Sequence, residues 1–381
     1  MISCKPQGDE FKYIDIDSID NKNHRIISPK ILKVKNAPSR ASRYTQPGDV
    51  LFSMVRPYLK NIALVEEDSC IASTGFFVCS PMQLLTSEYC YYMMLSDYVI
   101  YGLNQYMKGD NSPSINNGHI TSWLYPIPPI NEQLRISAEI KKWFVFIDDL
   151  ERGKIELESL VKQVKSKILD LAISGKLVPQ DPNDEPAIEL LKRINPSFEP
   201  CDNSHYENLP QGWTIVGLHS VAEIITGSTP SKLNAEYYNG DVPFYKPNDL
   251  DQGRHVRCAS EYLSQQGKSI SRSIPCNSIA VCCIGSIGKC GFIEKEGVTN
   301  QQINTIVPND AIFPLYMYYF CNSSTFIDEL KSLSSAVTIS IVNKSKLSTI
   351  QIPLPPIAEQ KRIISVIEKL YSHLDMITAE L

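Results

Sequence analysis

Apolar positions in two segments of the chain follow the same spacing, with alternating steps of four and three residues. They fall at Ile136, Ile140, Trp143, Ile147 and Leu150 in the first segment, and at Ile363, Ile367, Leu370, Leu374 and Ile377 in the second. This spacing is typical of the seam between two paired helices and is narrower than the stripe of a helix that lies on a sheet. The pattern therefore predicts two helices that pair through these ten positions.

The two predicted helices begin with nearly the same motif. Pro126-Ile-Pro-Pro-Ile-Asn-Glu-Gln-Leu-Arg-Ile136 recurs as Pro353-Leu-Pro-Pro-Ile-Ala-Glu-Gln-Lys-Arg-Ile363, 227 positions later. We expect the first helix from about Asn131, as N-cap, to Ser174, with Gly175 as its C-terminal stop. At ~1.5 Å per residue such a helix is ~65 Å long.

The second helix reaches only Leu381, so it is expected to cover about half of the first. The seam from Leu157 to Leu171 would then need another partner, because an amphipathic helix draws most of its stability from packing. Another subunit, a second copy of this chain or a helix in the linker could fill that role.

The repeat predicts the order domain, helix, domain, helix. The fold class is α+β, with two mixed α/β domains separated by long antiparallel coiled-coil helices in a pseudo-twofold internal repeat. The expected parts are a first domain at 1–125, a first helix at 126–178, a linker at 179–208 with a short helix near 187–194, a second domain at 209–352 and a second, short helix at 353–381.

Outside the helices the two domains resemble each other only in outline. Residues 50–55 and 61–65 are predicted to pair as strands, residues 278–285 parallel 50–57, and residues 242–249 parallel 11–17. Aligning Tyr13 with Tyr245 leaves the first domain without a counterpart of residues 209–241. We interpret the first domain as short at its start, whether as a genuine variant, a recombination product or the result of a misplaced start codon.

Composition is that of an ordinary globular protein. The 381 residues are 43% hydrophobic and 21% charged, and neither an 18-residue apolar run nor a signal-peptide core is visible, which predicts a cytoplasmic protein. The 11 cysteines show no disulfide framework. Four of them, Cys276, Cys282, Cys283 and Cys290, lack both a Cys-x-x-Cys pair and a nearby histidine, so we interpret them as buried strand residues and predict no zinc site.

Basic residues cluster near the N-terminus. Between residues 25 and 60 there are eight basic side chains and one acid, Asp49, although the whole chain has a net charge of -5. Such a density predicts contacts to phosphates, with a solvated basic surface as the alternative. The candidates are Arg25, Lys30, Lys33, Lys35, Arg40, Arg43, Arg56 and Lys60.

The second domain has scattered candidates instead of a basic run. They are Lys246 and Asn248, Arg254 and Arg257 with His255, Lys289, and the amides Gln301 and Gln302. Asn and Gln can pair with adenine and Arg with guanine in the major groove, whereas Lys bound to phosphate only positions a protein. We therefore predict base contacts for Gln301 and Gln302 and a phosphate contact for Lys289; the alternative is that these are solvated loop residues.

Catalytic motifs are missing from the sequence. Both Pro-Pro pairs lack the polar residue and the aromatic ring that would grip a flipped base, and no Gly-x-Gly-x-x-Gly loop follows a strand. Residues 285–289 fall short of a phosphate-binding loop, and Cys290 replaces its hydroxyl residue. We expect no catalytic site, no bound metal and no cofactor.

Several motifs together give a resemblance to a known family. They are the duplicated Pro-x-Pro-Pro-Ile-x-Glu-Gln-x-Arg-Ile start, Leu209-Pro-x-Gly-Trp213, Gly227-Ser-Thr-Pro230, Ala37-Pro-Ser-Arg-Ala-Ser-Arg43, Pro47-Gly-Asp-Val-Leu-Phe-Ser53 and Gly175-Lys-Leu-Val-Pro-Gln180. With them the whole chain resembles the specificity subunit of type I restriction-modification systems.

The resemblance implies a subunit without chemistry of its own. It implies two target-recognition domains that each read half of a split sequence in double-stranded DNA. It also implies helices that set the gap and dock methyltransferase subunits, with a restriction and translocase subunit joining the complex. A scaffold that no longer reads DNA, such as a silent recombination cassette product or a self-associating adaptor, remains the rival hypothesis, and a fused methyltransferase or nuclease is a third.

Overall fold

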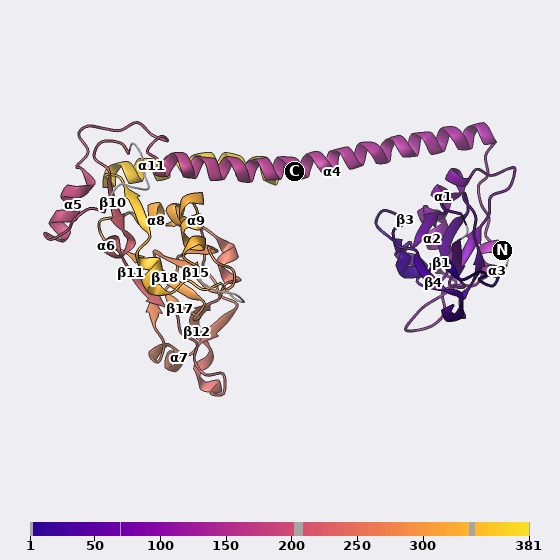
Figure 1. Cartoon of the computed structure of the whole chain (residues 1–381), viewed down its shortest axis with the longest axis horizontal. Coiled ribbons are helices and arrows are strands. Elements are labelled where there is room, and N and C mark those ends of the chain that lie inside the picture. The colour runs from indigo at the N-terminus through magenta and orange to yellow at the C-terminus, as the bar shows by residue number, and fades with distance from the viewer. Residues whose placement is uncertain (1–2, 69, 202–208, 335–339, 381) are drawn as a thin grey trace. The chain divides into compact units, whose positions relative to one another are not determined.

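The computed structural model describes residues 3–68, 70–201, 209–334 and 340–380, so the end of the expected linker, 202–208, lies outside the described residues. The chain divides into two compact units, Met1–Arg152 and Gly153–Leu381 (Figure 1). Helix α4 (Ile130–Ile173) crosses the boundary between them and confirms the long helix expected from the seam pattern. Each unit mixes helices and strands, which confirms the α+β class.

The first unit contains two small sheets. One has the order β4-β1-β8-β5, and the other the order β7-β6-β9. Their strands are β1 (Glu10–Ile14), β4 (Lys30–Lys33), β5 (Ala41–Tyr44), β6 (Val50–Ser53), β7 (Ile62–Leu64), β8 (Cys70–Ser73) and β9 (Phe76–Cys79), beside a ribbon of β2 (Ile19–Asp20) and β3 (Arg25–Ile26). The helices are α1 (Ser87–Leu95), α2 (Asp97–Asn104) and α3 (Asn117–Thr121), with short 3-10 turns η1 (Ile16–Ser18), η2 (Val34–Asn36) and η3 (Pro57–Leu59).

The second unit contains the same two sheets with additions. The orders are β13-β12-β17-β14 and β11-β18-β15-β16, and β10 pairs with β19. The strands are β10 (Thr214–Gly217), β11 (Ala222–Thr226), β12 (Tyr238–Tyr245), β13 (Glu261–Leu263), β14 (Ser273–Ile274), β15 (Ser278–Cys282), β16 (Cys290–Ile293), β17 (Gly297–Thr299), β18 (Ile303–Pro308) and β19 (Gln351–Leu354). The helices are α5 (Ala187–Ile194), α6 (Leu218–Val221), α7 (Gln265–Ser269), α8 (Pro314–Cys321), α9 (Ser324–Ser332), α10 (Lys344–Ser348) and α11 (Ile357–Ala379), with 3-10 turns η4 (Ala235–Tyr237) and η5 (Asp249–Gln252).

Strand pairing confirms the parallels drawn from the sequence. β6 pairs antiparallel with β7 and β9, as β15 does with β16 and β18. In the other sheet β1 runs parallel to β8, as β12 runs parallel to β17. The apolar faces of these strands form the cores, together with α8 in the second unit. Phe52 on β6 and Tyr316 and Phe320 on α8 are fully buried.

A buried glutamine anchors each long helix to its unit through the same three contacts. Gln133 accepts a hydrogen bond from the Thr86 N–H (2.9 Å) and donates to the carbonyls of Leu84 (2.9 Å) and Pro128 (2.8 Å). Its repeat, 227 positions on, accepts from the Phe313 N–H (2.7 Å) and donates to the carbonyls of residues 311 (3.4 Å) and 355 (2.9 Å). Every partner is shifted by the same 227 positions, so the glutamine of the duplicated motif joins helix to domain in both halves.

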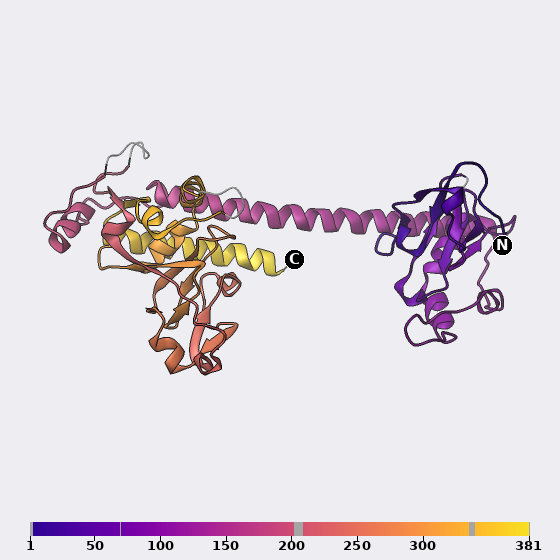
Figure 2. The same ribbon diagram turned by 60° about the horizontal axis from the view of Figure 1, so that its bottom comes forward.

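Helix α11 packs on the C-terminal part of α4, within the second unit. The Tyr371 hydroxyl donates to the Lys165 carbonyl (3.0 Å), and Lys165 forms an ion pair with Asp375 (2.5 Å). Toward the end of α4 and the start of α11, Ile168, Leu169 and Ala172 share a buried cluster with Ile363 and Ile367. The α11 numbering falls as the α4 numbering rises, so the two helices are antiparallel, and Figures 1 and 2 both show them side by side.

This packing corrects the predicted pairing and the expectation of an uncovered seam. The stretch from Lys165 to Ala172 has its partner in α11, whereas Trp143, Ile147 and Leu150 are 56%, 45% and 58% exposed. Ile136 packs on the core of the first unit and Ile140 is half-buried. In the second helix Ile363 and Ile367 are buried, Leu370 and Leu374 pack against the same cluster, and Ile377 is 44% exposed.

Helix α4 also begins one residue earlier than expected. It starts at Ile130, so Asn131 lies in its first turn and is not the N-cap. At the other end Gly175 adopts a left-handed conformation (φ 70°), and the Lys176 N–H bonds back to the Leu171 carbonyl (2.9 Å). This confirms Gly175 as the stop signal. The short helix in the linker, α5, is confirmed as well.

Candidate nucleic-acid interface

Three loops of the second unit meet at one end of the sheet β11-β18-β15-β16. They are the segment 227–230 after β11, the loop 284–289 after β15 and the turn 300–302 before β18. The Cys283 N–H donates to the Gln302 carbonyl (2.8 Å), and the Ser228 N–H donates to the Thr299 carbonyl (2.9 Å). Because these strands alternate in direction, the ends of β11 and β15 and the start of β18 lie together. We call this set the loop end of the second unit.

The first unit has an equivalent loop end with different chemistry. Its loop 54–60 follows β6, and the Met54 N–H donates to the Gly75 carbonyl (2.8 Å), as Cys283 does to Gln302. The turn Ser73-Thr-Gly75 therefore stands where the second unit has Asn300-Gln-Gln302. The Arg56 N–H bonds to the Pro113 carbonyl (2.8 Å), as the Gly285 N–H bonds to the Ser340 carbonyl (3.2 Å).

The loop 54–60 places charged residues in left-handed backbone conformations. Arg56 has φ 47° and Lys60 has φ 54°, whereas Gly285 (φ 80°) and Gly288 (φ 88°) take the left-handed positions of the second unit's loop. A residue with a Cβ costs ~1 kcal/mol or more there, and such strain concentrates at functional sites. The Arg56 guanidinium donates to the Asn111 carbonyl (2.7 Å), and Lys60 pairs with Asp97 (2.9 Å).

The other basic residues of the first unit lie on several elements. Arg25 is on β3, Lys30 and Lys33 on β4, Lys35 in η2 and Arg43 on β5. Arg40 lies at the loop end, because the Thr74 N–H donates to its carbonyl (2.8 Å). The structure thus brings Arg40, Arg56 and Lys60 to one loop end and distributes the rest of the predicted patch over the β4-β1-β8-β5 sheet, η2 and the β2-β3 ribbon.

Five of the predicted cations of the first unit are exposed and form no ion pair with any described residue. They are Arg25, Lys33, Lys35, Arg40 and Arg56. Lys30, by contrast, pairs with Asp15, and the Nε of Arg43 is buried without a hydrogen-bond partner in the described structure.

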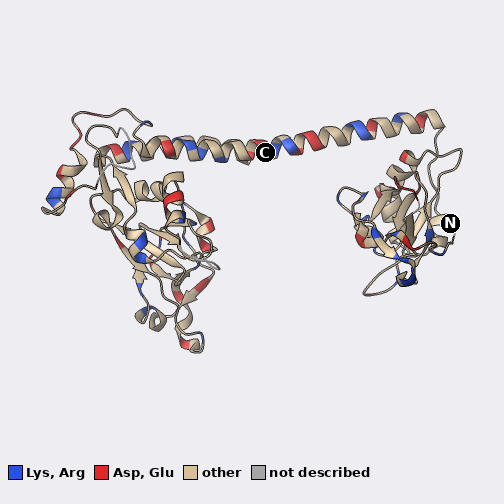
Figure 3. Cartoon of the chain, in the orientation of Figure 1, with Lys and Arg blue, Asp and Glu red and all other residues tan. Residues whose placement is uncertain are grey.

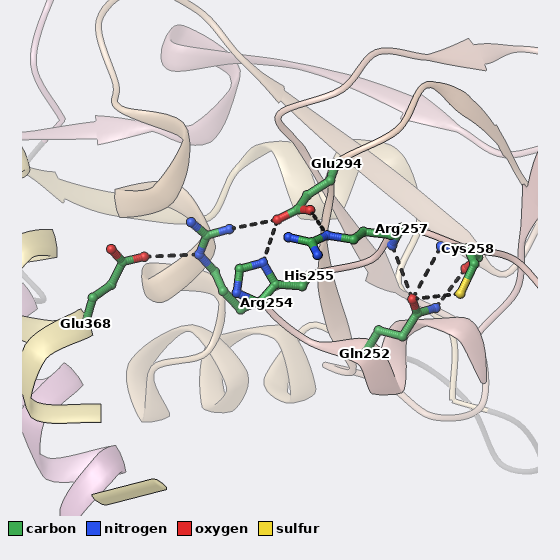
Figure 4. A network of polar contacts seen from close by, with 7 residues as sticks. All are labelled: Gln252, Arg254, His255, Arg257, Cys258, Glu294 and Glu368. Atoms are coloured by element: carbon green, nitrogen blue, oxygen red, sulfur yellow. Dashed lines mark hydrogen bonds and ion pairs between the residues drawn. The ribbon is translucent and has the colours of Figure 1, made fainter. Parts of the chain in front are cut away.

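Most predicted cations of the second unit are already neutralised by carboxylates. Glu294 pairs with Arg257, with Arg254 (3.6 Å) and with the Nδ1 of His255 (2.6 Å), as Figure 4 shows. Hydrogen bonds from Arg257 and then His255 lower the pKa of Glu294. Arg254 also bonds to Glu368 on α11 (3.2 Å) and stacks on a phenylalanine ring, so its role is to fasten α11 to the sheet.

Lys289 and Lys246 are similarly paired. Lys289 lies 2.7 Å from Asp251, and Lys246 pairs with Glu261 and stands over the ring of Phe244 (5.7 Å). Asn248 is exposed just before η5. These contacts leave the second unit with fewer free positive charges than its sequence indicates.

Both predicted amides lie at the loop end. Gln301 is exposed and accepts a hydrogen bond from the hydroxyl of Thr229, in the Gly227-Ser-Thr-Pro230 motif. Gln302 is half-buried and donates to the Ile284 carbonyl (3.4 Å), which ties the turn to the neighbouring loop. Gln301 is thus the more available of the two for an outside partner.

Sequence reasoning missed Arg272 at this end of the sheet. Its guanidinium donates to the Thr226 carbonyl (2.7 Å), and its backbone N–H bonds to the Ser228 hydroxyl (3.3 Å). The Gly227-Ser-Thr-Pro230 motif, which was read only as a family signature, could have indicated that its neighbours in space belong to the site.

Comparison with known proteins shows what the chain is similar to. Residues 210–381 match the family model described as the type I restriction modification DNA specificity domain. The HindI specificity subunit of Haemophilus influenzae is 26% identical over 408 residues, which cover 94% of this chain and 88% of the relative. The EcoAI specificity subunit of Escherichia coli is 30% identical over 257 residues, 59% of this chain and 42% of the relative.

Over most of its length the chain is similar to specificity subunits of type I restriction-modification systems.

Solved structures show the same fold. The HsdS subunit from Thermoanaerobacter tengcongensis has a TM-score of 0.61 at 23% identity and covers 97% of this chain and 85% of that one. A chain from a study of complex assembly and conformational transition of the type I R-M system has a TM-score of 0.71 at 24% identity, with 97% and 86% covered.

Helix α4 carries exposed apolar side chains on several faces. Residues 143–147, Trp-Phe-Val-Phe-Ile, are between 45% and 56% exposed, and Leu150 is 58% exposed. Figure 3 shows acidic and basic residues along the same helix. Helices that are apolar all round are normally covered, so this stretch has the character of a binding surface.

The prediction of buried strand cysteines is confirmed for Cys282 in β15 and Cys290 in β16. Cys283 is buried just after β15, and for Cys276 the prediction is wrong, because this residue is exposed and lies outside the strands. Burial raises the pKa of Cys283 to about 11 and that of Cys290 to about 12, which keeps both as inert thiols. Within the described ranges no group of residues could hold a metal ion.

None of the helices in the described part of the chain is both long enough and apolar enough to span a membrane.

Proposed function

We propose that the chain is the DNA-reading specificity subunit of a type I restriction-modification complex and reads a two-part target in double-stranded DNA, one part with each unit. The observation that carries this is the pair of equivalent loop ends. Both loop ends follow equivalent strands and make equivalent backbone hydrogen bonds. The first unit presents Arg and Lys there, whereas the second unit presents amides. A repeated scaffold with different side chains at equivalent loops is what two different half-sites require.

We assign roles in DNA contact to individual residues according to whether their side chains are exposed and free of ion pairs. Arg40 and Arg56 are proposed to contact guanine or phosphate from the first unit, and Gln301 an adenine edge from the second. Lys33 and Lys35, which are exposed and not paired among the described residues, are proposed phosphate contacts. Lys246, Arg254 and Arg257 would first have to leave their carboxylates, so we propose that they hold the second unit in shape.

Partners are proposed to dock on α4. The exposed apolar run from Trp143 to Ile147 is suited to methyltransferase subunits, and the restriction and translocase subunit would join through them. The chain supplies recognition and leaves catalysis to those partners. We place the complex in the cytoplasm, where its DNA substrate lies.

The proposal is tested with the chain co-expressed with its methyltransferase subunits. Methylated-motif mapping should yield one bipartite motif, and duplex affinity should fall steeply with salt, by about 0.9 in log affinity per log salt for each phosphate contact. Arg40→Ala with Lys33→Ala should lower this slope by about 2, whereas the control Lys246→Ala should leave it unchanged. A flat salt response would contradict DNA reading and favour the scaffold hypothesis.

The spacer role of α4 has a separate test. Deleting seven residues from 139–153 removes about 10 Å of helix and keeps the apolar face in phase within about 20°. It also leaves the contacts of α11 near Lys165 intact. We expect a changed gap between unchanged half-sites in the methylated motif. An altered half-site with an unchanged gap would refute the spacer role.

A further inference from the structure

The start of α11 is enclosed by contacts from Gln180, Asp184 and Trp213, which we call the clasp. Among the described residues the start of α4 has no equivalent contacts. Glu359 is 1% exposed and accepts hydrogen bonds from the Trp213 indole (3.0 Å) and the Gln180 amide (3.0 Å). Its repeat, Glu132, is exposed, and among the described residues none donates a hydrogen bond to its carboxylate. The same position in the two copies of the motif is therefore filled in one unit and open in the other.

A second charged contact differs in the same way. Arg362 on α11 forms a two-point ion pair with Asp184 (2.5 and 3.2 Å). Its repeat, Arg135, is exposed on α4 and forms no ion pair with any of the described residues. Glu132 and Arg135 thus present a carboxylate and a guanidinium in the arrangement that, in the second unit, binds an indole, an amide and a second carboxylate.

Two strands that cover apolar residues of the second unit have no counterpart among the described residues of the first. β19 pairs with β10, which leaves Ile352 and Leu354 0% and 1% exposed, whereas Ile127, the repeat of Leu354, is 55% exposed. Leu124, the repeat of Gln351, is 80% exposed. β18 pairs with β11, whereas β9, its repeat, is an edge strand of its sheet. The open edge and the open helix start both correspond to contacts that residues 175–227 make in the second unit.

We infer that the first unit has a docking site for a polypeptide segment with the chemistry of residues 175–227. It would bring a glutamine and an indole to Glu132, a carboxylate to Arg135, one strand to residues 124–127 and another to the edge of β9. The internal repeat defines this occupant, because the second unit shows the filled form of the same surface. A second copy of this chain is a poor source, because its own segment already binds Glu359 and Arg362.

The test uses the full chain and a synthetic peptide of residues 175–227 as the probe. We expect saturable binding by fluorescence anisotropy, with new protection from hydrogen exchange at residues 76–79 and 124–127. Glu132→Lys in the chain, and separately Trp213→Phe in the peptide, should each weaken binding about tenfold, the usual effect of losing a hydrogen bond to a charged group. Glu151→Lys, at another exposed position of α4, is the matched control and should bind as the unmodified chain does.

Four results would overturn the inference. The first three are the absence of saturable binding, equal affinity of Glu132→Lys and the unmodified chain, and protection confined to residues 351–354, which would mean exchange with the segment already in the second unit. Self-association that protects residues 124–127 without peptide would also overturn it, because a second copy would then fill the site. The proposed DNA reading is measured separately, so either can fail alone.

Discussion

The two loop ends use the same backbone with opposite choices of residue. The second unit places Gly285 and Gly288 in the left-handed positions, where glycine is unstrained, and the first unit places Arg56 and Lys60 there. Equivalent contacts to Pro113 and Ser340 hold both loops. The difference teaches that the scaffold fixes where a side chain is presented, while the loop residue can be exchanged even at a cost in strain.

A second difference concerns what is covered. The glutamine anchors of α4 and α11 are the same, but only α11 has its charged first turns enclosed by chain. The anchor therefore belongs to the repeated core, and the clasp belongs to one unit alone. Substitutions at repeated positions can separate these two kinds of contact.

The largest effect is expected at the anchor. Gln360→Ala leaves the buried Phe313 N–H and two carbonyls without partners, which should lower the free energy of unfolding of the second unit by about 3 kcal/mol. Gln133→Ala should cost the first unit about the same, because its three bonds are equivalent. Native-state hydrogen exchange of α8 and α1 reports each unit separately. A cost below about 1 kcal/mol in one unit only would break the equivalence.

Only part of the glutamine anchor could be predicted from the sequence. The duplicated motif indicated two helices with the same start, and the matching strand runs indicated related domains, but nothing in the spacing pointed Gln133 toward Thr86 and Leu84. The position of α11 along α4 was not predictable from the pattern. The four-three spacing continues through both halves of α4, so either half fits α11 equally well, and contacts such as Tyr371 with Lys165 decide between them.

Charge in the candidate site shows the same limit. A cation in the sequence reveals no partner that lies far away along the chain, so Arg257 with Glu294 and Lys289 with Asp251 looked like free charges. In the first unit most nearby residues are basic, and there the exposed Lys33 and Arg40 agree with the local balance. Sequence reasoning was therefore more informative where one sign of charge dominates.

The next largest effect separates the clasp from its open counterpart. Glu359→Ala removes the buried acceptor for Trp213 and Gln180 and should destabilise the second unit by about 2 kcal/mol. Glu132→Ala, its matched control, should change stability by less than about 0.5 kcal/mol, because the side chain is exposed. Urea unfolding followed by hydrogen exchange within each unit measures both. Equal losses would show that the start of α4 is enclosed after all.

A smaller effect, of opposite sign, is expected in the loop 54–60. Arg56→Gly relieves a left-handed residue, which should raise the stability of the first unit by up to about 1 kcal/mol, less the loss of the bond to Asn111 and the greater freedom of glycine in the unfolded chain. DNA affinity should fall in the same variant. Gly285→Arg is the reverse exchange and should destabilise the second unit. A variant that gains stability without losing affinity would remove Arg56 from the interface.

The smallest effect concerns acid. Because Arg257 and His255 lower the pKa of Glu294, its ionised form stabilises the folded state, and this contribution is complete above the unfolded value of about 4.3. This contribution to stability is lost as the pH falls through the lower pKa that Glu294 has in the folded state. Glu294→Gln should therefore differ from the unmodified chain at pH 7 and converge with it toward pH 3, as measured by urea unfolding at each pH. Glu296→Gln, which breaks a single contact to Lys268 (2.6 Å), is the control. A difference that stays constant down to pH 3 would mean that packing, and not charge, gives Glu294 its role.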